Sequence, residues 1–236
     1  MTRIGKPSAV VIGASGGIGR AIEAALIDEA AFDVVHGLAR SRSGAQHIDL
    51  LDEGSIAAAA AVVGNGPPPT LVIIATGLLH DGGRGPEKTL RNLDPAWLAK
   101  LYAVNAIGPA LVAKHFLPVM PIIGRTVFAA LSARVGSISD NGLGGWYGYR
   151  ASKAGLNMLI KNLAIEESRR NKRAIVVGLH PGTVDTELSR PFQNNVQPGR
   201  LFAPDRAALQ LLDVIEGLNV SDSGKLIDYE GAEIAF

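Results

Sequence analysis

The sequence predicts an α/β fold in which a doubly wound parallel sheet lies between two layers of helices, as a single domain over residues 1–236. Three observations lead to this prediction. Short apolar runs rich in β-branched residues alternate along the chain with longer stretches of helical periodicity. A glycine-rich turn joins the first of these runs to the first helical stretch. The length of 236 residues fits one domain, and 47% hydrophobic residues with only 5% aromatic ones provide an aliphatic core.

The first strand and the turn after it organise the fold. Residues 9–12 form an apolar strand, followed by Gly13, Gly17 and Gly19 and by helical periodicity over residues 20–27. Glycine N–H groups and a helix N-terminus meet at this point, where a pyrophosphate can approach without meeting a Cβ atom. The arrangement predicts nucleotide binding and a Rossmann-type sheet.

The end of the second strand, residues 32–40, predicts cofactor selectivity, because a dinucleotide-binding fold reads the adenosine ribose there. Arg40 and Ser41 stand at this end, and no Asp or Glu does. A guanidinium favours the 2′-phosphate of NADP, whereas a carboxylate would repel it. NADP(H) is therefore the preferred cofactor and NAD(H) the alternative, while the competing interpretation is that Arg40 and Arg42 only solubilise a loop. A short third strand is predicted over residues 47–50, and its Asp49 can accept from the adenine amino group.

The remaining elements follow in alternation. Helices are predicted over residues 52–63, with Asp52 or Ser55 near the start, and over 95–118, 148–170 and 204–218. Strands are predicted over residues 70–75, 125–131, 174–180 and 225–227. Residues 78–94 are interpreted as a surface excursion. Residues 183–203 carry few periodic apolar positions and several breakers, so they are expected to form a substrate lid.

Composition excludes several kinds of function. A net charge of +1 provides no field for nucleic acid or acidic membranes, and the basic cluster at residues 169–173 falls at a predicted helix end, where it complements the dipole. The chain has no cysteine, which excludes disulfides, thiolate catalysis and cysteine-ligated zinc. None of the five histidines pairs with another at i, i+4, so no metal is expected. Without a long apolar segment, a cytoplasmic protein is expected.

The residues suited to chemistry lie at strand ends and at one helix start. Tyr149 and Lys153 are four residues apart on one helical face. An ammonium beside a phenol, whose ordinary pKa is about 10, is expected to lower that pKa and to prepare it for proton transfer with a carbonyl or alcohol. Lys153 can also bind ribose hydroxyls. Ser132, at a strand end, can hydrogen-bond a substrate oxygen or serve only as a turn former, and Asn105, in mid-helix, is interpreted first as an interhelical contact.

The chain carries, in this order, the glycine loop, Asn105, Ser132, Tyr149 with Lys153, and Pro181-Gly182-Thr183. With these features it resembles the short-chain dehydrogenase/reductase superfamily over essentially its whole length. The segments 131–141 and 144–153 resemble its C-factor-like and sniffer-like carbonyl reductase branch. The resemblance implies that Tyr149 is the general acid/base, Lys153 its electrostatic partner and a ribose ligand, Ser132 the carbonyl orienter and Asn105 the holder of a relay water. Around the cofactor it implies Gly13, Ser15, Gly17 and Ile18 at the pyrophosphate and adenosine, Asp49 and Leu50 at adenine, Ala75 and Gly77 along the cofactor, and Pro181, Thr183, Val184 and Thr186 at the nicotinamide end.

The chain departs from the family pattern at two places. Residues 74–77 read Ile-Ala-Thr-Gly where the family has Asn-Asn-Ala-Gly, so an asparagine contact at the adenosine ribose is missing. Ser132 lies 17 positions before Tyr149, where the family spacing is about 13, so the extra residues must loop out. Ser137 and Ser139 are the fallback candidates for the hydroxyl. Tyr147 lies close by, but only Tyr149 has a lysine four residues on.

These residues together predict an NADP-dependent oxidoreductase that transfers hydride between the nicotinamide and a small carbonyl or alcohol substrate. Two alternatives remain: a nucleotide-binding signalling or scaffold protein with incidental catalysis, and an NAD-dependent alcohol dehydrogenase. The resemblance also implies a homodimer or homotetramer through the helices around residues 96–117 and 148–169, with Leu156, Leu159 and Leu163 as apolar positions of the latter. No sequence pattern identifies the substrate, although residues 136–147 and 183–203 are expected to shape its pocket.

Overall fold

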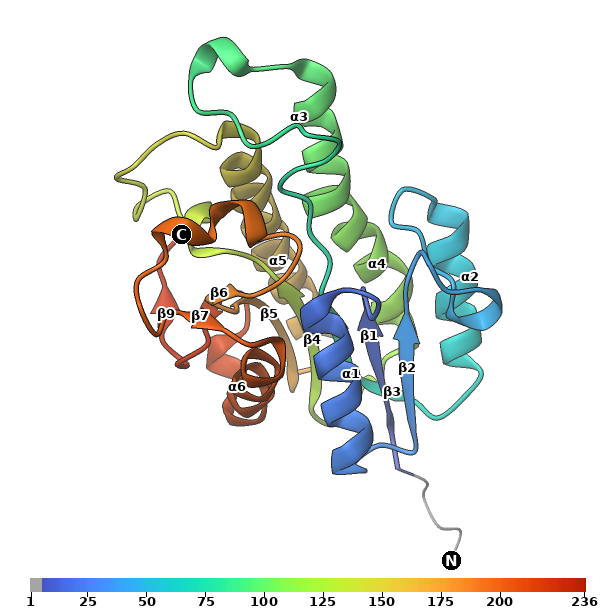
Figure 1. Ribbon diagram of the computed structural model, residues 1–236. Coiled ribbons are helices and arrows are strands. Elements are labelled where there is room, and N and C mark those ends of the chain that lie inside the picture. Colours follow the sequence, from blue (N-terminus) through green and yellow to red (C-terminus); the bar gives the residue numbers. More distant parts are fainter. Residues whose placement is uncertain (1–5) are drawn as a thin grey trace, which may run out of the picture.

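The computed structural model describes residues 6–236, which form three layers: one main sheet and a layer of helices on each of its faces (Figure 1). The strands of this sheet stand in the order β2-β1-β3-β4-β5-β8-β9, and all are parallel except β9, which runs antiparallel to β8. They are β1 (Ser8–Ile12), β2 (Val34–Leu38), β3 (Pro69–Ile74), β4 (Thr126–Leu131), β5 (Ala174–His180), β8 (Leu226–Asp228) and β9 (Glu233–Ile234). The doubly wound α/β fold predicted from the sequence is confirmed, with a short antiparallel edge strand added.

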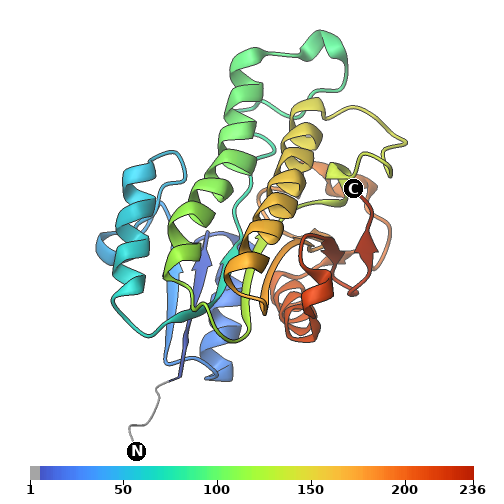
Figure 2. The same ribbon diagram turned by 180° about the vertical axis from the view of Figure 1, so that it is seen from behind.

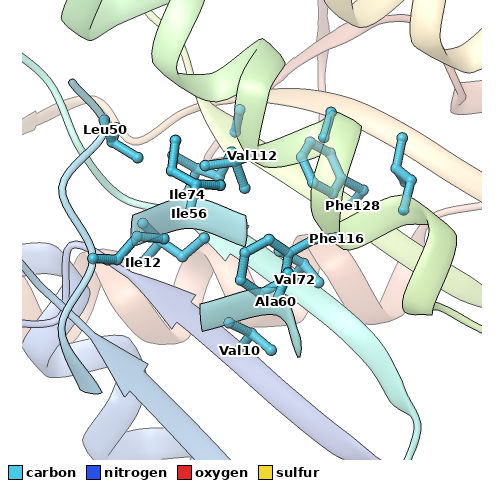
Figure 3. Packing of buried hydrophobic residues seen from close by; sticks show 14 of the residues in the cluster. Val10, Ile12, Leu50, Ile56, Ala60, Val72, Ile74, Val112, Phe116 and Phe128 are labelled. Carbon is cyan, nitrogen blue, oxygen red and sulfur yellow. The ribbon is translucent and has the colours of Figure 1, made fainter. Parts of the chain in front are cut away.

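Alternation along the buried strands explains why helices cover both faces of the sheet. Val10 and Ile12 of β1 face a core with α2 (Glu53–Gly64), α4 (Gly108–Phe116) and α5 (Tyr147–Arg170), as Figures 2 and 3 show. Ala9 and Val11 face the opposite core, under α1 (Gly17–Glu29) and α6 (Pro204–Gly217). Asp52 begins α2 as predicted, because its carboxylate accepts from the N–H of Gly54 at 2.9 Å.

The predicted strand over residues 47–50 is wrong. Only a single bridge joins His47 to Ala39, and a 3-10 turn over Gly44–Gln46 precedes it. The backbone N–H of Asp49 is bound by the Ser55 hydroxyl at 2.8 Å, so the segment is tied to the start of α2 and does not extend the sheet.

The predicted helix over residues 95–118 is interrupted at Asn105. It consists of α3 (Pro95–Tyr102), a π-helical segment (Ala103–Ile107), α4 and a closing 3-10 turn (Leu117–Val119). By length and mean hydropathy, Pro95–Val119 could cross a membrane. In this structure Leu101, Val112, Ala113 and Phe116 of the same stretch are buried in the protein, as in a core helix.

The expected lid over residues 183–203 contains more regular structure than its sequence suggests. Its ends pair as a two-stranded parallel sheet of β6 (Thr183–Val184) and β7 (Leu201–Phe202), and a 3-10 helix (Arg190–Asn195) lies between them. The side chain of Phe202 is buried beside Val184 and Ala207, so this segment is anchored at both ends.

Candidate active site

The glycine turn lies at the carboxyl end of β1, between β1 and α1, where a Rossmann-type sheet binds its ligand. Gly13 has φ +92°, a left-handed conformation that favours glycine. Gly19 packs directly on the turn, because a Cβ there would lie 2.2 Å from the Gly13 carbonyl oxygen. The first turn of α1 holds no acidic residue, and Gly16 provides no side-chain cap. The N-terminus of α1 therefore offers N–H groups and a positive dipole end to an anion.

A groove of about 420 Å³ runs over this end of the sheet. It collects eight of the predicted cofactor residues, namely Gly13, Ser15, Arg40, Ser41, Asp49, Leu50, Ala75 and Gly77. It is also lined by residues that the sequence analysis did not single out, among them Ile48, Leu51, Asp81, Lys100 and Val104. Asp81 lies in the segment of residues 78–94, and Lys100 and Val104 lie in the helical stretch after it. No pattern in the sequence indicates that these three residues face the groove.

The two arginines after β2 differ in their surroundings. Arg42 is held in place, since its guanidinium donates to both carboxylate oxygens of Glu23, at 2.8 and 2.6 Å, and to the carbonyl of Gly37. Arg40 is exposed at the groove, and within residues 6–236 it forms no ion pair. Of the two, Arg40 is therefore the cation available to a bound anion.

Tyr149 and Lys153 lie together at the start of α5, as their spacing predicts. The Lys153 Nζ is 5.9 Å from the centroid of the Tyr149 ring, and it donates to the carbonyl of Leu131 at 2.7 Å. Both side chains are buried, with 7% of Tyr149 and 2% of Lys153 exposed. The groove reaches this pair at Gly77, because a Cβ at this glycine would lie 3.9 Å from the Lys153 Nζ.

Burial determines the protonation of this pair. It raises the pKa of Tyr149 to about 12 and lowers the pKa of Lys153 to about 8. The direction of the Tyr149 shift is therefore opposite to the lowering expected from a neighbouring ammonium, because burial disfavours the phenolate. Tyr149 keeps its proton at neutral pH and is able to act as an acid.

Asn105 ties three segments together from the π-helical turn. Its Oδ1 accepts from the N–H of Leu78 at 2.8 Å, and its Nδ2 donates to the carbonyl of Leu78 at 2.8 Å and to the Ser152 hydroxyl at 3.1 Å. With 1% of its surface exposed, it holds the chain after β3 against α5 beside Lys153. A π-turn of this kind often marks a functional position, and a sequence of helical periodicity does not reveal it.

Ser132 has a different partner from the one expected. Its hydroxyl is buried in the interface between β4 and α5, where it donates to Asn157 Oδ1 at 2.6 Å. The next residue, Ala133, packs in the small apolar cluster that contains Tyr149. The contacts of Ser132 therefore connect a strand to a helix. The extra residues before Tyr149 loop out, and the hydroxyls of Ser137 and Ser139 donate to the carbonyls of Ala235 and Phe236.

Aromatic side chains cover Tyr149. The Trp146 ring lies 6.2 Å from the Tyr149 ring and 5.0 Å from that of Phe192, on the predicted lid. The imidazole of His80 lies 5.9 Å from Phe192, and its Nε2 is 3.1 Å from the carbonyl of Glu187. The segment after β3, the loop before α5 and the lid therefore meet above the phenol, in keeping with the pocket-shaping role expected of residues 136–147 and 183–203.

Of the residues predicted at the nicotinamide end, Pro181 directly follows β5, and Thr183, Val184 and Thr186 lie at the start of the lid. Thr186 reaches the glycine turn, because a Cβ at Gly17 would lie 2.7 Å from the Thr186 Cγ2. Pro181 and Thr183 are half-buried, whereas Val184 is buried in a cluster that Ile18 packs against. In the described part of the chain, His, Asp and Glu side chains form no group that could hold a metal.

The glycine turn, the groove and the buried tyrosine–lysine pair are the features expected of an α/β oxidoreductase with a Rossmann-type fold. Residues 13–209 match the family model described as Enoyl-(Acyl carrier protein) reductase. C-signal of Myxococcus xanthus is 36% identical over 145 residues, which are 61% of this chain and 82% of C-signal. A 1-hydroxy-2-glutathionyl-2-methyl-3-butene dehydrogenase of Rhodococcus sp. (strain AD45) is 30% identical over 59% of each chain. The chain belongs to the short-chain dehydrogenase/reductase family of oxidoreductases, and the match to C-signal confirms the predicted C-factor-like branch.

Solved structures share the fold over almost the whole chain. An NADPH-bound carbonyl reductase from chicken fatty liver superposes with a TM-score of 0.80 at 24% identity, covering 100% of this chain and 97% of that one. The carbonyl reductase Sniffer of D. melanogaster superposes with a TM-score of 0.77 at 20% identity, covering 98% of this chain and 100% of that one. At these identities the likeness concerns the fold.

Proposed function

We propose that this oxidoreductase is an NADP-dependent reductase of ketones or aldehydes. The observation that carries the proposal is the buried Tyr149–Lys153 pair, which adjoins the groove at Gly77. Burial raises the pKa of the Tyr149 phenol, which keeps it protonated at neutral pH. A protonated phenol is the form needed to deliver a proton to a carbonyl oxygen. The proposal includes a cytoplasmic location.

The residues of the groove fit a dinucleotide. The cradle at Gly13 and Gly19 leaves no room for a Cβ, and the free N-terminus of α1 suits a pyrophosphate. Arg40, without an ion pair in the described chain, suits a 2′-phosphate. Three structural relatives carry NADPH or NADP in their descriptions, which supports the preference for NADP(H).

Bound NADPH would supply the hydride. In the proposed mechanism, Tyr149 donates its phenolic proton to the carbonyl oxygen as negative charge develops there. Lys153, within 5.9 Å of the ring, stabilises the phenolate that forms and can bind ribose hydroxyls. Asn105 is proposed as a positioning residue, because its polar atoms bind Leu78 and Ser152. Ser132 is proposed to link β4 to α5 through Asn157. The aromatic cover formed by Trp146, Phe192 and His80 would exclude water from the reacting carbonyl.

A second candidate is a nucleotide-binding signalling protein, which the 36% identity to C-signal favours. The experiment that separates the two measures NADPH and NADH oxidation by the wild type against a panel of aldehydes, ketones and quinones. The reductase proposal predicts turnover that depends on NADPH. Tight NADPH binding without turnover on any compound would instead favour the signalling protein.

A further inference from the structure

Glu87 is a buried carboxylate in a segment that the sequence marks as surface. Only 3% of it is exposed, and its Oε2 accepts from the backbone N–H of Gly148 at 3.1 Å. Its Oε1 is buried without a hydrogen-bond partner. No lysine, arginine or histidine forms an ion pair with Glu87 anywhere in residues 6–236. Since an unpaired buried charge is costly, this placement requires a compensating interaction.

The first turn of α5 supplies that interaction. Trp146, at the N-cap, has φ 51° and ψ 41°, a left-handed conformation unusual for a residue with a side chain, and it makes no side-chain cap. The first turn of α5 contains no acidic residue either. Glu87 therefore acts as the missing cap from 61 residues away: its carboxylate binds Gly148 N–H, and its carbonyl accepts from Trp146 N–H at 2.5 Å. The positive end of the helix dipole stabilises the carboxylate there.

The catalytic phenol belongs to the same turn. Tyr149 is the third residue of α5, directly after Gly148. Gly148 is tightly enclosed, since a Cβ there would lie 2.6 Å from Leu101 Cδ1, 2.8 Å from Leu98 Cδ2 and 2.9 Å from Glu87 Oε1. The side chain of Arg150 also holds this turn, because its guanidinium donates to the carbonyls of Gly145 and Val135. Glu87 differs from it in binding a backbone N–H of the turn itself, directly before Tyr149.

We infer that Glu87 is a positioning residue for Tyr149, which it serves by capping the catalytic helix from the segment between β3 and α3. The inference rests on the proposed reductase function. It assigns to residues 78–94 a part in catalysis, because this segment delivers the cap.

The test compares Glu87→Leu, Glu87→Asp and Glu87→Gln with Lys88→Leu, an exposed neighbour, as the matched control. The leucine removes the acceptor, the aspartate keeps the charge but is one methylene shorter, and the glutamine keeps an acceptor of the same length. We expect kcat at saturating substrate and NADPH to fall at least tenfold for the leucine and aspartate variants and less than fivefold for the glutamine variant. The Kd for NADPH should change less than twofold in all of them, because Glu87 does not line the groove.

Amide hydrogen exchange gives a second measurement that does not depend on turnover. The N–H of Gly148 should exchange at least tenfold faster in Glu87→Leu and Glu87→Asp than in the wild type or Lys88→Leu. If the leucine variant does not fold, the aspartate variant carries both measurements. A kcat within twofold of the wild type, or unchanged exchange at Gly148, overturns the inference. A wild type without turnover on any carbonyl compound contradicts the proposed function alone, and the exchange rates then still decide whether Glu87 caps α5.

Discussion

At the scale of single residues, desolvation is the dominant influence on the pKa values of Tyr149 and Lys153. Tyr149 and Lys153 are neighbours, yet the Lys153 Nζ hydrogen-bonds the carbonyl of Leu131, and burial pushes the two pKa values toward the neutral forms. The spacing of the pair was readable from the sequence, because it depends only on helical geometry. The direction of the pKa shift of Tyr149 was not readable from the sequence, because it depends on how completely the lid and Trp146 cover the ring.

Lys153 should make folding stability depend on pH. Its pKa falls from 10.5 in the unfolded chain to about 8 in the folded protein, so over this interval the unfolded state binds the proton that the folded state has lost. Stability contributed by Lys153 therefore rises with pH. Between pH 7 and pH 9.5, the free energy of unfolding of the wild type should rise by about 2 kcal/mol relative to Lys153→Met, as measured in urea.

The matched control is Lys172→Met, which removes an exposed lysine and should leave the pH dependence of the wild type unchanged. Parallel stability curves for the wild type and Lys153→Met would show that the Lys153 ammonium is not desolvated.

Arg40 should determine the choice of cofactor. A charge-assisted hydrogen bond to a phosphate contributes about 1.5–3 kcal/mol, so Arg40→Glu should weaken NADPH binding by about ten- to a hundredfold. NADH binding, measured by the same fluorescence titration, should change little. Equal losses for both cofactors, or a wild type that prefers NADH, would contradict this role and favour the NAD-dependent alcohol dehydrogenase.

At the scale of elements, the main strands and helices were predictable from the apolar pattern of the sequence. The apolar runs that became β1, β3, β4 and β5 are buried on both faces, which leaves a continuous hydrophobic signal. The π-turn at Asn105 and the two-residue strand β9 carry no such signal. They depend on contacts with Leu78 and β8, which only the folded chain brings together.

Ser132 should act as a link between β4 and α5. Ser132→Ala leaves the buried Asn157 Oδ1 without its donor, and we expect it to lower the free energy of unfolding by roughly 1–3 kcal/mol. The kcat should stay within about threefold of the wild type. Ser168→Ala, which removes an exposed hydroxyl from the same helix, is the control. A hundredfold loss of kcat with stability retained would restore the carbonyl-orienting role that the family resemblance implies.

At the scale of the whole molecule, the structure revises the apolar face expected for assembly. Leu156 is buried in the core, and Leu159 and Leu163 pack against it, so these residues cover the sheet. The exposed apolar residues of the same helices are different ones, including Ile107, Met158 and Ile165, with 51%, 62% and 47% exposed. We propose that these residues form the dimer face.

The double variant Met158→Glu, Ile165→Glu should therefore shift the protein from an oligomer to a monomer in light scattering after size exclusion. Ile27→Glu, at an exposed position of α1, should leave the mass unchanged. A wild type that is already monomeric, or a double variant of unchanged mass, would exclude this face.

The central claim of a reductase with Tyr149 as its acid is tested most directly by kcat for carbonyl reduction in Tyr149→Phe at saturating NADPH. Tyr147→Phe, two residues earlier and 40% exposed, is the matched control. We predict that Tyr149→Phe lowers kcat by about 10²–10⁴-fold while the Kd for NADPH is retained, and that Tyr147→Phe stays within twofold of the wild type. Equal activity of the two variants would show that the proton comes from another group and would contradict the role assigned to Tyr149.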